Sequence, residues 1–325
     1  MLNKAGPVTS TWDEHRVAGF LDAAYENILI DPEIARSLSS LISGLWDCRQ
    51  SLTENVWNEL RRICARHPLS QLLQQDPMTA WSAQKPRGYP GDGVLLDFIY
   101  GGSFVPPQVH TASRVGQSIY KFLNELPGAH AIRSRLNRVA TLIDRIAMEN
   151  TSASILAVGC GHLREADRSS ALQHRLVGRF LAVDQDPRSL TVVSNRYSEL
   201  GISTLQCSVI ELLKGQNNLG KFHLIYAVGL YDYLAQGAAR RLTEVLFDHL
   251  HPDGEIFVVN GLPGVPSSAY METYMDWHIV YRTLEQLEAT ADDVACDLIQ
   301  RKEVFTDQEK IFAFLWLKRR GKAIA

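Results

Sequence analysis

Apolar residues recur at helical spacing through residues 1–148. From Val17 they stand three, four, seven, eight, eleven and twelve positions further on, which is the spacing of one continuous helix face. The same kind of spacing returns over residues 34–45 and 56–64. We therefore expect three helices that pack through their apolar faces, the first of them through Phe20, Leu21, Ala24, Tyr25, Ile28 and Leu29.

Short polar signals indicate where these helices begin. A Ser or Thr followed three residues later by Glu predicts a capping box, in which each side chain bonds the backbone N–H of the other residue. An Asp directly before Pro predicts an N-cap followed by the first helical position. The signals are Thr11 with Glu14, Asp31 with Pro32, and Ser51 with Glu54.

The helical pattern stops between Pro77 and Pro107. Prolines, glycines and aromatic residues crowd into this segment, which predicts either an ordered functional loop or a connector. Helical spacing resumes near Ser113 and continues from Ile132 to Ile146. We assign residues 1–148 to a helical domain that includes the segment 77–107.

After Ser152 short β-branched runs alternate with helical stretches, which favours βαβ units and a mainly parallel sheet. The last two runs are separated only by Phe305–Ile311, too few residues for a parallel crossover, so the final strand should be antiparallel. Residues 149–325 are thus predicted to form a seven-stranded, doubly wound, Rossmann-like α/β domain. The predicted strands are Ser154–Gly159, Arg179–Asp184, Ser203–Ser208, Phe222–Gly229, Glu255–Asn260, Cys296–Val304 and Phe312–Lys318.

Composition narrows the classes of function. The chain has 325 residues, 46% hydrophobic and 21% charged, with a net charge of −3, which excludes a disordered protein and disfavours a nucleic-acid partner. No apolar run is long enough for a membrane span, and we expect a cytoplasmic protein that acts on a small molecule, with a homodimer left open. The scattered cysteines, predicted to be reduced thiols, are Cys48, Cys64, Cys160, Cys207 and Cys296.

The strongest chemical signal joins the first two predicted strands. Gly159-Cys160-Gly161 follows the first strand, and Asp184, 25 positions after Gly159, ends the second. Glycines at such a turn let the backbone approach a ligand closely. A carboxylate at the end of the second strand can accept hydrogen bonds from both ribose hydroxyls of a nucleoside. NAD and S-adenosylmethionine both fit. A dinucleotide is disfavoured because Arg164 stands where a third glycine would be, and because the sheet is predicted to close with an antiparallel hairpin.

With these features, residues 152–320 resemble the class I S-adenosylmethionine-dependent methyltransferases. The resemblance implies S-adenosylmethionine as cofactor, with the glycine turn at its methionine moiety and Asp184 at its ribose. The cofactor-binding residues implied by the motifs and their neighbours are Gly159, Cys160, Gly161, Arg164, Asp184, Gln185, Cys207, Ser208, Val209, Ala227, Val228 and Gly229.

A narrower resemblance covers nearly the whole chain. The blocks 85–92, 225–234 and 275–283 are similar to those of bacterial methyltransferases associated with 3-hydroxypalmitic acid methyl ester formation. Within the first block, Arg87, Tyr89 and Asp92 are expected either to cap the cofactor or to form a connector held by an Arg87–Asp92 contact. Two positions depart from the family pattern: Gly93-Val94, where a tyrosine and an acid are expected, and His162, where a proline is common.

Candidate catalytic and substrate residues follow the fourth and fifth strands. Asp232 is the expected base, with Tyr231 and Tyr89 as further catalytic candidates; the alternative for Tyr231 and Tyr233 is packing under the next helix. The substrate-binding candidates are Tyr233, Asn260, Trp277, His278 and Tyr281, with residues 277 and 281 expected on one helix face. Asp184 and Asp186 are the nearest approach to a cluster of acidic metal ligands. Asp186 followed by Pro187 is typical of a helix N-cap and first helical position, so no metal is expected.

The leading hypothesis is methyl transfer from S-adenosylmethionine to a small organic molecule, with the helical domain supplying a lid and an apolar pocket. The narrow resemblance implies a fatty hydroxy acid carboxylate as acceptor and its methyl ester as product. Three alternatives remain: N- or O-methylation of a secondary metabolite, an NAD-dependent oxidoreductase, and a binding module without catalytic activity.

Overall fold

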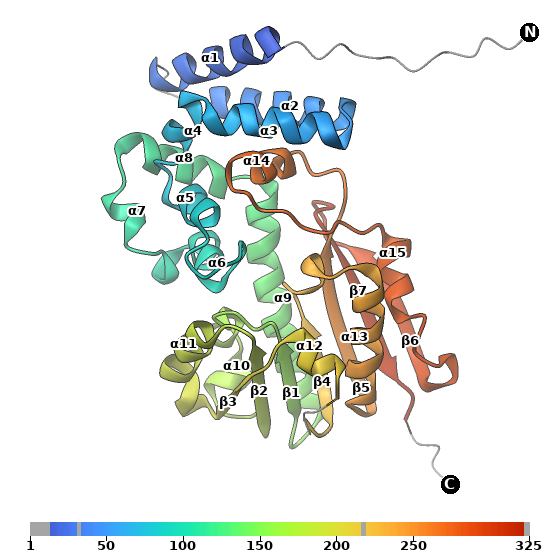
Figure 1. Cartoon of the computed structure of the whole chain (residues 1–325). Helices are drawn as coiled ribbons and strands as arrows, with labels where there is room; N and C mark the ends of the chain where they lie inside the picture. The colour runs from blue at the N-terminus through green and yellow to red at the C-terminus, as the bar shows by residue number, and fades with distance from the viewer. Residues whose placement is uncertain (1–13, 31–33, 216–218, 322–325) are drawn as a thin grey trace, which may run out of the picture. The chain divides into compact units, whose positions relative to one another are not determined.

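A computed structural model describes residues 14–30, 34–215 and 219–321, with side chains from residue 17 (Figure 1). The chain forms two compact units. One contains the described residues up to Gln84 together with Pro107–Leu123 and Pro266–Trp277, and the other contains Lys85–Pro106, Asn124–Val265 and the described residues from His278. This division differs from the expected boundary at residue 148, since the residues 85–106 and 124–148 belong with the sheet.

The first unit is helical, as the apolar spacing predicted. Helix α3 is capped differently from the prediction: Thr53 is its N-cap without a side-chain cap bond, while the Ser51 hydroxyl donates to the Asp47 carbonyl, because Ser51 still belongs to α2. Thr11, Asp31 and Pro32 lie outside the described residues. The helices are α1 Glu14–Ile30, α2 Ile34–Ser51, α3 Glu54–Arg66, α4 Pro68–Leu73, α5 Pro77–Gln84, α7 Gln108–Thr111, α8 Arg114–Asn124 and α14 Ser267–Tyr274.

The segment 77–107 is more ordered than its proline and glycine content suggests. It contains α5 (Pro77–Gln84), α6 (Gly93–Tyr100) and a 3₁₀ turn at Gly102–Phe104. Asp92 starts α6 by accepting a hydrogen bond from the Leu95 N–H at 2.8 Å. Along the described residues, no helix has both the length and the apolar character needed to cross a bilayer.

The second unit contains a seven-stranded sheet, and the predicted strand count and direction are confirmed. The strand order is β3-β2-β1-β4-β5-β7-β6, and β7 runs antiparallel to both of its neighbours while the other pairs are parallel. The strands are β1 Ser154–Val158, β2 Arg179–Asp184, β3 Ile202–Gln206, β4 Phe222–Ala227, β5 Leu250–Gly261, β6 Ile299–Thr306 and β7 Phe312–Arg319.

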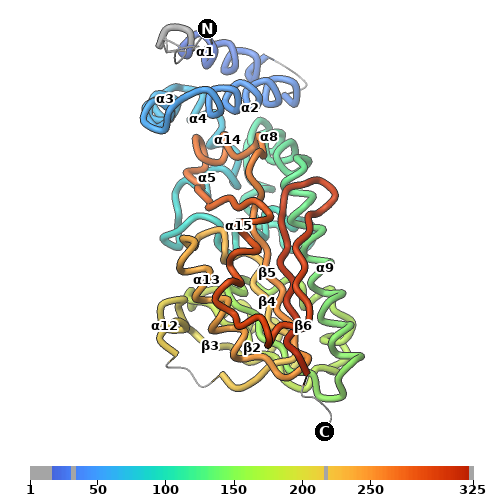
Figure 2. The backbone as a smooth tube through the Cα atoms, turned by 90° about the vertical axis from the view of Figure 1, so that its right-hand side faces the viewer, coloured from blue at the N-terminus to red at the C-terminus, as the bar shows by residue number. Residues whose placement is uncertain are grey.

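Helices cover both faces of this sheet, because successive strand residues point to opposite faces (Figure 2). On one face Ile155 and Ala157 join a core that includes Ile143 of α9, and on the other Leu156 and Val158 pack with Leu242 of α13. The helices of this unit are α6, α9 Pro127–Glu149, α10 Ser170–Gln173, α11 Pro187–Tyr197, α12 Val209–Leu213, α13 Gln236–Asp248 and α15 Leu284–Glu288.

After the glycine turn, Leu163 adopts a left-handed conformation, a 3₁₀ turn occupies Arg164–Asp167, and α10 begins at Ser170. One local expectation is wrong. The helical stretch expected over residues 277–281 is irregular. Its backbone bonds to the turn after β4, where the Val280 N–H donates to the Asp232 carbonyl at 2.7 Å, and the next residues bond to the end of β5, where the Arg282 N–H donates to the Gly261 carbonyl at 3.0 Å.

The strand order reverses between β1 and β4. From β1 the chain proceeds outward to β2 and β3, then returns to place β4 on the other side of β1. In open α/β sheets the carboxyl ends of the strands at such a reversal leave a crevice that binds ligands. The fold therefore places a crevice next to the glycine turn that follows β1.

Candidate functional site

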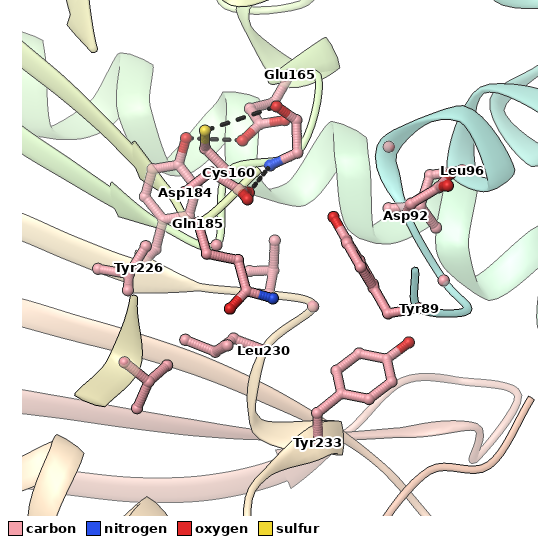
Figure 3. Close-up of a pocket in the computed structure, with 18 of the residues that line it drawn as sticks. Tyr89, Asp92, Leu96, Cys160, Glu165, Asp184, Gln185, Tyr226, Leu230 and Tyr233 are labelled. Carbon is pink, nitrogen blue, oxygen red and sulfur yellow. Dashed lines mark hydrogen bonds between the residues drawn. The ribbon is translucent and has the colours of Figure 1, made fainter. Parts of the chain in front are cut away.

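A pocket lies at the carboxyl ends of β1 to β4, within the sheet unit. The turns after these strands supply most of its wall, and the segment before α6, α6 itself and α9 supply the rest. Figure 3 shows Tyr89 and Tyr233 on one side of the pocket and Cys160 and Asp184 on the other. The residues that line it are Tyr89, Gly91, Asp92, Gly93, Leu96, Tyr100, Arg135, Val158, Gly159, Cys160, Gly161, Glu165, Asp184, Gln185, Cys207, Val209, Leu212, Tyr226, Val228, Gly229, Leu230 and Tyr233.

The glycine turn has the backbone geometry that its sequence predicts. Gly159 has φ of 66° and Gly161 has φ of 53°, a region that side chains rarely tolerate. A Cβ added at Gly161 would stand 3.7 Å from the Gly93 Cα, so the chain before α6 passes close to this turn. The glycines therefore keep the main chain open to a ligand between the two segments.

Asp184 fixes the turn from the end of β2. Its carboxylate accepts hydrogen bonds from the Gly161 N–H at 2.8 Å and from the Asp186 N–H at 2.9 Å. The side chain is buried, and burial raises the pKa of the carboxyl despite these two bonds. Each carboxylate oxygen has a second acceptor position, so Asp184 can still receive hydroxyl donors from the pocket.

The turn after β3 contributes an apolar wall. Cys207, Val209 and Leu212 line the pocket there. Ser208, predicted to flank the adenine, is the N-cap of α12, forms a capping box with Glu211, and is not among the residues that line the pocket. Gln185, next to Asp184, lines the same region.

The chain before α6 forms part of the pocket wall, and a buried ion pair anchors it. Arg87 does not line the pocket. Its guanidinium donates to the Asp186 carboxylate and to the Ser189 hydroxyl, both at 2.8 Å, rather than making the contact with Asp92 that was the alternative expectation. Tyr89 and Asp92 do line the pocket.

Charged and phenolic side chains gather at one part of the wall, and the sequence analysis missed them. Glu165 accepts a hydrogen bond from the Tyr226 hydroxyl at 2.7 Å, and burial raises the pKa of its carboxyl. Arg135 and Tyr100 line the pocket with them. An arginine within the apolar face of a predicted helix was the one signal that could have revealed Arg135.

Arg164 and His162 turn away from the pocket toward α6. Arg164 forms a bidentate pair with Asp97, each N···O distance 2.7 Å, and its guanidinium lies over the Phe104 ring. The His162 Nδ1 is 2.7 Å from the Asp97 carboxylate. These two side chains stabilise the junction between α6 and the glycine turn, and Arg164 is not among the residues that line the pocket.

The turn after β4 separates the tyrosines that the sequence grouped together. Tyr233 lines the pocket, whereas Tyr231 is buried and its hydroxyl is 2.8 Å from the Thr243 Oγ1 of α13. Asp232 is also buried and outside the pocket wall, and its carboxylate accepts from the Gly261 N–H at 2.7 Å. Burial raises the pKa of Asp232. Tyr231 and Asp232 thus make structural contacts.

The remaining substrate candidates also lie outside this pocket wall. The Asn260 amide donates to the Val280 carbonyl, and its oxygen accepts from Arg282. Trp277 is buried in the helical unit, while His278 is exposed and Tyr281 half-buried in the sheet unit. Ala227 is buried beneath the pocket, and Val228 and Gly229, the next residues, line it.

Comparisons with known proteins identify the fold. No family model and no curated protein sequence matches the chain. A solved structure described as a possible exported protein from Bordetella parapertussis aligns over 98% of this chain and 100% of its own, with 13% identity and a TM-score of 0.60. This likeness shows a shared fold.

Two further solved structures align over a smaller share of the chain. The N-methyltransferase NodS from Bradyrhizobium japonicum WM9, in complex with S-adenosyl-L-homocysteine, aligns over 61% of this chain and 90% of its own, with 13% identity and a TM-score of 0.42. The magnesium protoporphyrin IX methyltransferase from Synechocystis PCC 6803, with bound SAH, aligns over 60% and 87%, with 10% identity and a TM-score of 0.44.

Proposed function

We propose that this protein is an S-adenosylmethionine-dependent methyltransferase that acts on a small organic molecule. The observation that carries the proposal is the buried Asp184 carboxylate, held by two backbone N–H groups beside Gly159 and Gly161, which both adopt positive φ. This pair of features suits a nucleoside whose ribose bears two free hydroxyls.

The pocket wall fits the parts of this cofactor. Asp184 would accept from the ribose hydroxyls, Cys207, Val209 and Leu212 would flank the adenine, and Gly159–Gly161 would lie along the amino-acid portion. When bound, the cofactor supplies a methyl group attached to a positively charged sulfur. The residues of this chain would hold acceptor and donor in line and exclude water, which is the main requirement for such a displacement.

A dinucleotide suits the pocket less well. A pyrophosphate normally rests on the N-terminus of a helix directly after the glycine turn, but here a 3₁₀ turn follows and α10 begins only at Ser170. The Glu165 carboxylate also lines the pocket beyond that turn and would repel a diphosphate. These two features disfavour the oxidoreductase alternative.

Asp92, Asp184 and Tyr89 are not arranged as general bases, which suits an acceptor that is already ionised. Asp92 and Asp184 both accept from backbone N–H groups, and burial together with nearby carboxylates raises the pKa of Tyr89, so this phenol stays protonated. A carboxylate acceptor needs no base at neutral pH. We therefore propose O-methylation of a carboxylate; the family resemblance implies a fatty hydroxy acid as acceptor and its methyl ester as product.

Calorimetric titration tests the cofactor. S-adenosylmethionine and its demethylated product should bind the wild-type protein, NAD should not, and Asp184→Ala should abolish binding of both adenosyl compounds. Binding of NAD without binding of S-adenosylmethionine would overturn the proposal. An intact fold with cofactor binding but no turnover on any acceptor would instead favour a binding module.

A labelling experiment tests the acceptor. The protein is incubated with methyl-labelled S-adenosylmethionine and a bacterial extract, and labelled products are identified by mass spectrometry. A base-labile labelled lipid ester supports carboxylate methylation. A labelled polar amine or ether would replace it with methylation of a secondary metabolite at nitrogen or oxygen.

A further inference from the structure

Arg282 is a buried arginine that joins several segments at the carboxyl edge of the sheet. Its exposed fraction is 1%, and its backbone N–H donates to the Gly261 carbonyl at the end of β5. An arginine suits this position because its planar guanidinium directs several N–H groups to different acceptors at once. The guanidinium donates to the Gln236 Oε1 and the Tyr231 carbonyl, each at 2.8 Å, and to the Asn260 Oδ1 and the Leu234 carbonyl.

Two of these bonds lie on either side of Tyr233. The 3₁₀ turn Tyr231–Tyr233 follows β4, and Leu234 is the next residue. Arg282 donates to the carbonyl of the first residue of this turn and to the carbonyl of the residue directly after it. Because the main chain rotates only about φ and ψ, carbonyls held on both sides of a residue limit its conformations. Arg282 therefore fixes the direction in which the Tyr233 side chain leaves the main chain.

Further hydrogen bonds hold the same turn. The Asp232 carboxylate accepts from the Gly261 N–H at 2.7 Å, and the Asp232 carbonyl accepts from the Val280 N–H at 2.7 Å. The Asn260 amide donates to the Val280 carbonyl at 2.8 Å. The turn after β4, the end of β5 and residues 280–282 thus form one hydrogen-bonded assembly, in which Arg282 is bonded to both of the other segments.

Tyr233 is the residue of this turn that reaches the pocket. Tyr231 and Asp232 are buried outside the pocket wall, whereas Tyr233 lines the pocket and is 39% exposed. Figure 3 shows its ring on the side of the pocket opposite Asp184. Since Asp184 suits the ribose of the cofactor, the Tyr233 ring faces the space left for the acceptor. An aromatic ring at that position can bury apolar surface of an acceptor.

We propose that Arg282 is a positioning residue for the methyl acceptor, because it holds the turn after β4 so that the Tyr233 ring forms the acceptor side of the pocket. Arg282 is not among the residues that line the pocket, and it acts through Tyr233. The inference rests on the proposed function and extends it, since it assigns acceptor affinity to a side chain outside the pocket. Cofactor affinity depends on other residues.

Steady-state kinetics test this assignment with 3-hydroxyhexadecanoate as the acceptor probe. The donor is methyl-labelled S-adenosylmethionine, and the label that base releases as methanol measures the ester. Arg282→Gln should raise the KM for the probe about 10-fold, as for loss of one aromatic contact, and keep kcat within about threefold. Calorimetry should give a Kd for S-adenosylhomocysteine within about threefold of wild type, which also shows that the variant is folded.

A double-mutant cycle tests whether Arg282 acts through Tyr233. Tyr233→Ala should raise the same KM about 10-fold. In that background Arg282→Gln should raise it less than about twofold further, because the ring that Arg282 positions is already absent. Additive effects of the two substitutions on KM would overturn the assignment.

Two further variants separate position from charge and from stability. Arg282→Lys keeps the positive charge near the Asp232 carboxylate but lacks the planar fork that reaches the carbonyls on both sides of Tyr233, so its KM should also rise at least about threefold. Arg319→Gln is the matched control. The Arg319 guanidinium donates to the Phe247 carbonyl at 2.9 Å, at the end of β7 away from the carboxyl edge, and this variant should keep the wild-type KM.

The outcomes separate this assignment from the proposed function. If the wild-type protein does not bind S-adenosylhomocysteine, the proposed function fails, and the role of Arg282 fails with it. If the wild type binds it and esterifies the probe, but either Arg282 variant keeps the wild-type KM or both lose cofactor affinity as strongly as acceptor affinity, the assignment is overturned while the proposed function stands. If the labelling experiment identifies another acceptor, the same comparison of KM values is made with that acceptor.

Discussion

The Asp184 carboxylate accepts a hydrogen bond from the Gly161 N–H at 2.8 Å, so the residue that ends β2 also fixes the glycine turn after β1. Its second oxygen accepts from the Asp186 N–H at the start of α11. One buried side chain thus shapes the backbone on two sides of the pocket and presents its remaining acceptor positions to a ligand. Its replacement should affect binding more than folding.

Asp184→Asn tests this expectation. The amide keeps one acceptor oxygen but places an NH₂ group toward the other backbone N–H, so it loses one internal bond and the anionic acceptor for the ribose. We expect S-adenosylmethionine affinity to fall about 10- to 100-fold by calorimetry. Asp292→Asn, at an exposed position, is the control. Unchanged affinity in Asp184→Asn would contradict ribose binding at this residue.

Arg87→Gln should loosen the chain before α6, which forms part of the pocket wall. The substitution removes a buried ion pair with Asp186 and a bond to Ser189. Loss of one partner of a buried pair costs about 3 kcal/mol, which should appear as a lower free energy of unfolding in urea. Cofactor affinity should fall as well, because Tyr89 and Asp92 are on the same segment. Equal stability of variant and wild type would show that the pair contributes nothing.

The stability lost in Arg87→Gln should depend on pH. Burial raises the pKa of Asp186, but hydrogen bonds from the Arg188 N–H and Ser189 and the charge of Arg87 outweigh burial and hold the pKa below its ordinary value of 3.8. A lowered carboxyl pKa gives stability that is present above the unfolded-state pKa and lost as pH falls through the folded-state pKa. The difference between variant and wild type should therefore persist from pH 7 to about 4 and shrink below that.

The sheet and its ligand edge were predictable because they depend on local patterns. Each strand is an apolar run bounded by polar residues, and in a parallel sheet the ends of β1 and β2 must meet at one edge. That reasoning places Gly159, Gly161 and Asp184 together without any knowledge of side-chain contacts. It also places Asp186 and Pro187 at the start of α11, as observed.

Side-chain direction within turns and helices was not predictable in this way. Tyr231 and Tyr233 are in one 3₁₀ turn, where residues two apart point in clearly different directions, so only Tyr233 reaches the pocket. Arg135 and Glu165 are brought together by the packing of α9 beside the turn after β1, a tertiary contact without a sequence signal of its own. Long-range backbone hydrogen bonds likewise replace the helix expected near residue 280. They join Val280 to Asp232 and Arg282 to Gly261.

Gly93 and His162, the two departures from the family pattern, lie against each other. A Cβ added at Gly93 would be 2.6 Å from the His162 Cδ2, and Asp97 holds that ring in place. Gly93→Ala should therefore lower the free energy of unfolding by about 1–3 kcal/mol. Gly237→Ala, at an exposed helical position with open space, should instead raise it by up to about 1 kcal/mol.

A double-mutant cycle isolates the contact between these two residues. His162→Ala removes the ring and leaves the Arg164–Asp97 pair intact. If the ring is the obstacle, Gly93→Ala in that background should cost at least about 1 kcal/mol less than in the wild type, measured by urea unfolding. Additive effects would show that Gly93 is required for another reason.

Tyr89 should act as a neutral wall of the pocket and not as a base. Burial raises the pKa of its phenol, and the charges of Asp184, Asp186 and Asp92 raise it further. Tyr89→Phe should then keep kcat within about threefold, and the pH profile of kcat should show no ionisation that this substitution removes. Tyr89→Ala should lose more, through weaker binding. Loss of a titration in Tyr89→Phe would show that the phenol transfers a proton.

Asp232 should contribute to stability and not to the chemical step. Its carboxylate accepts from the buried Gly261 N–H, and its carbonyl accepts from Val280. Asp232→Ala leaves that N–H without a partner and should lower the free energy of unfolding by about 1–3 kcal/mol. Asp232→Asn keeps an acceptor and avoids the cost of a buried charge, since burial raises the pKa of Asp232, so it should restore most of the stability.

Turnover by these two variants decides between a structural and a catalytic role for Asp232. Both proteins, assayed well below their melting temperatures and at saturating cofactor and acceptor, should keep kcat within about twofold of wild type, because the side chain is outside the pocket wall. A general base would behave differently. If Asp232→Asn melts like wild type and binds S-adenosylhomocysteine normally but loses about 100-fold or more in kcat, the carboxylate reaches the acceptor during turnover and is the base.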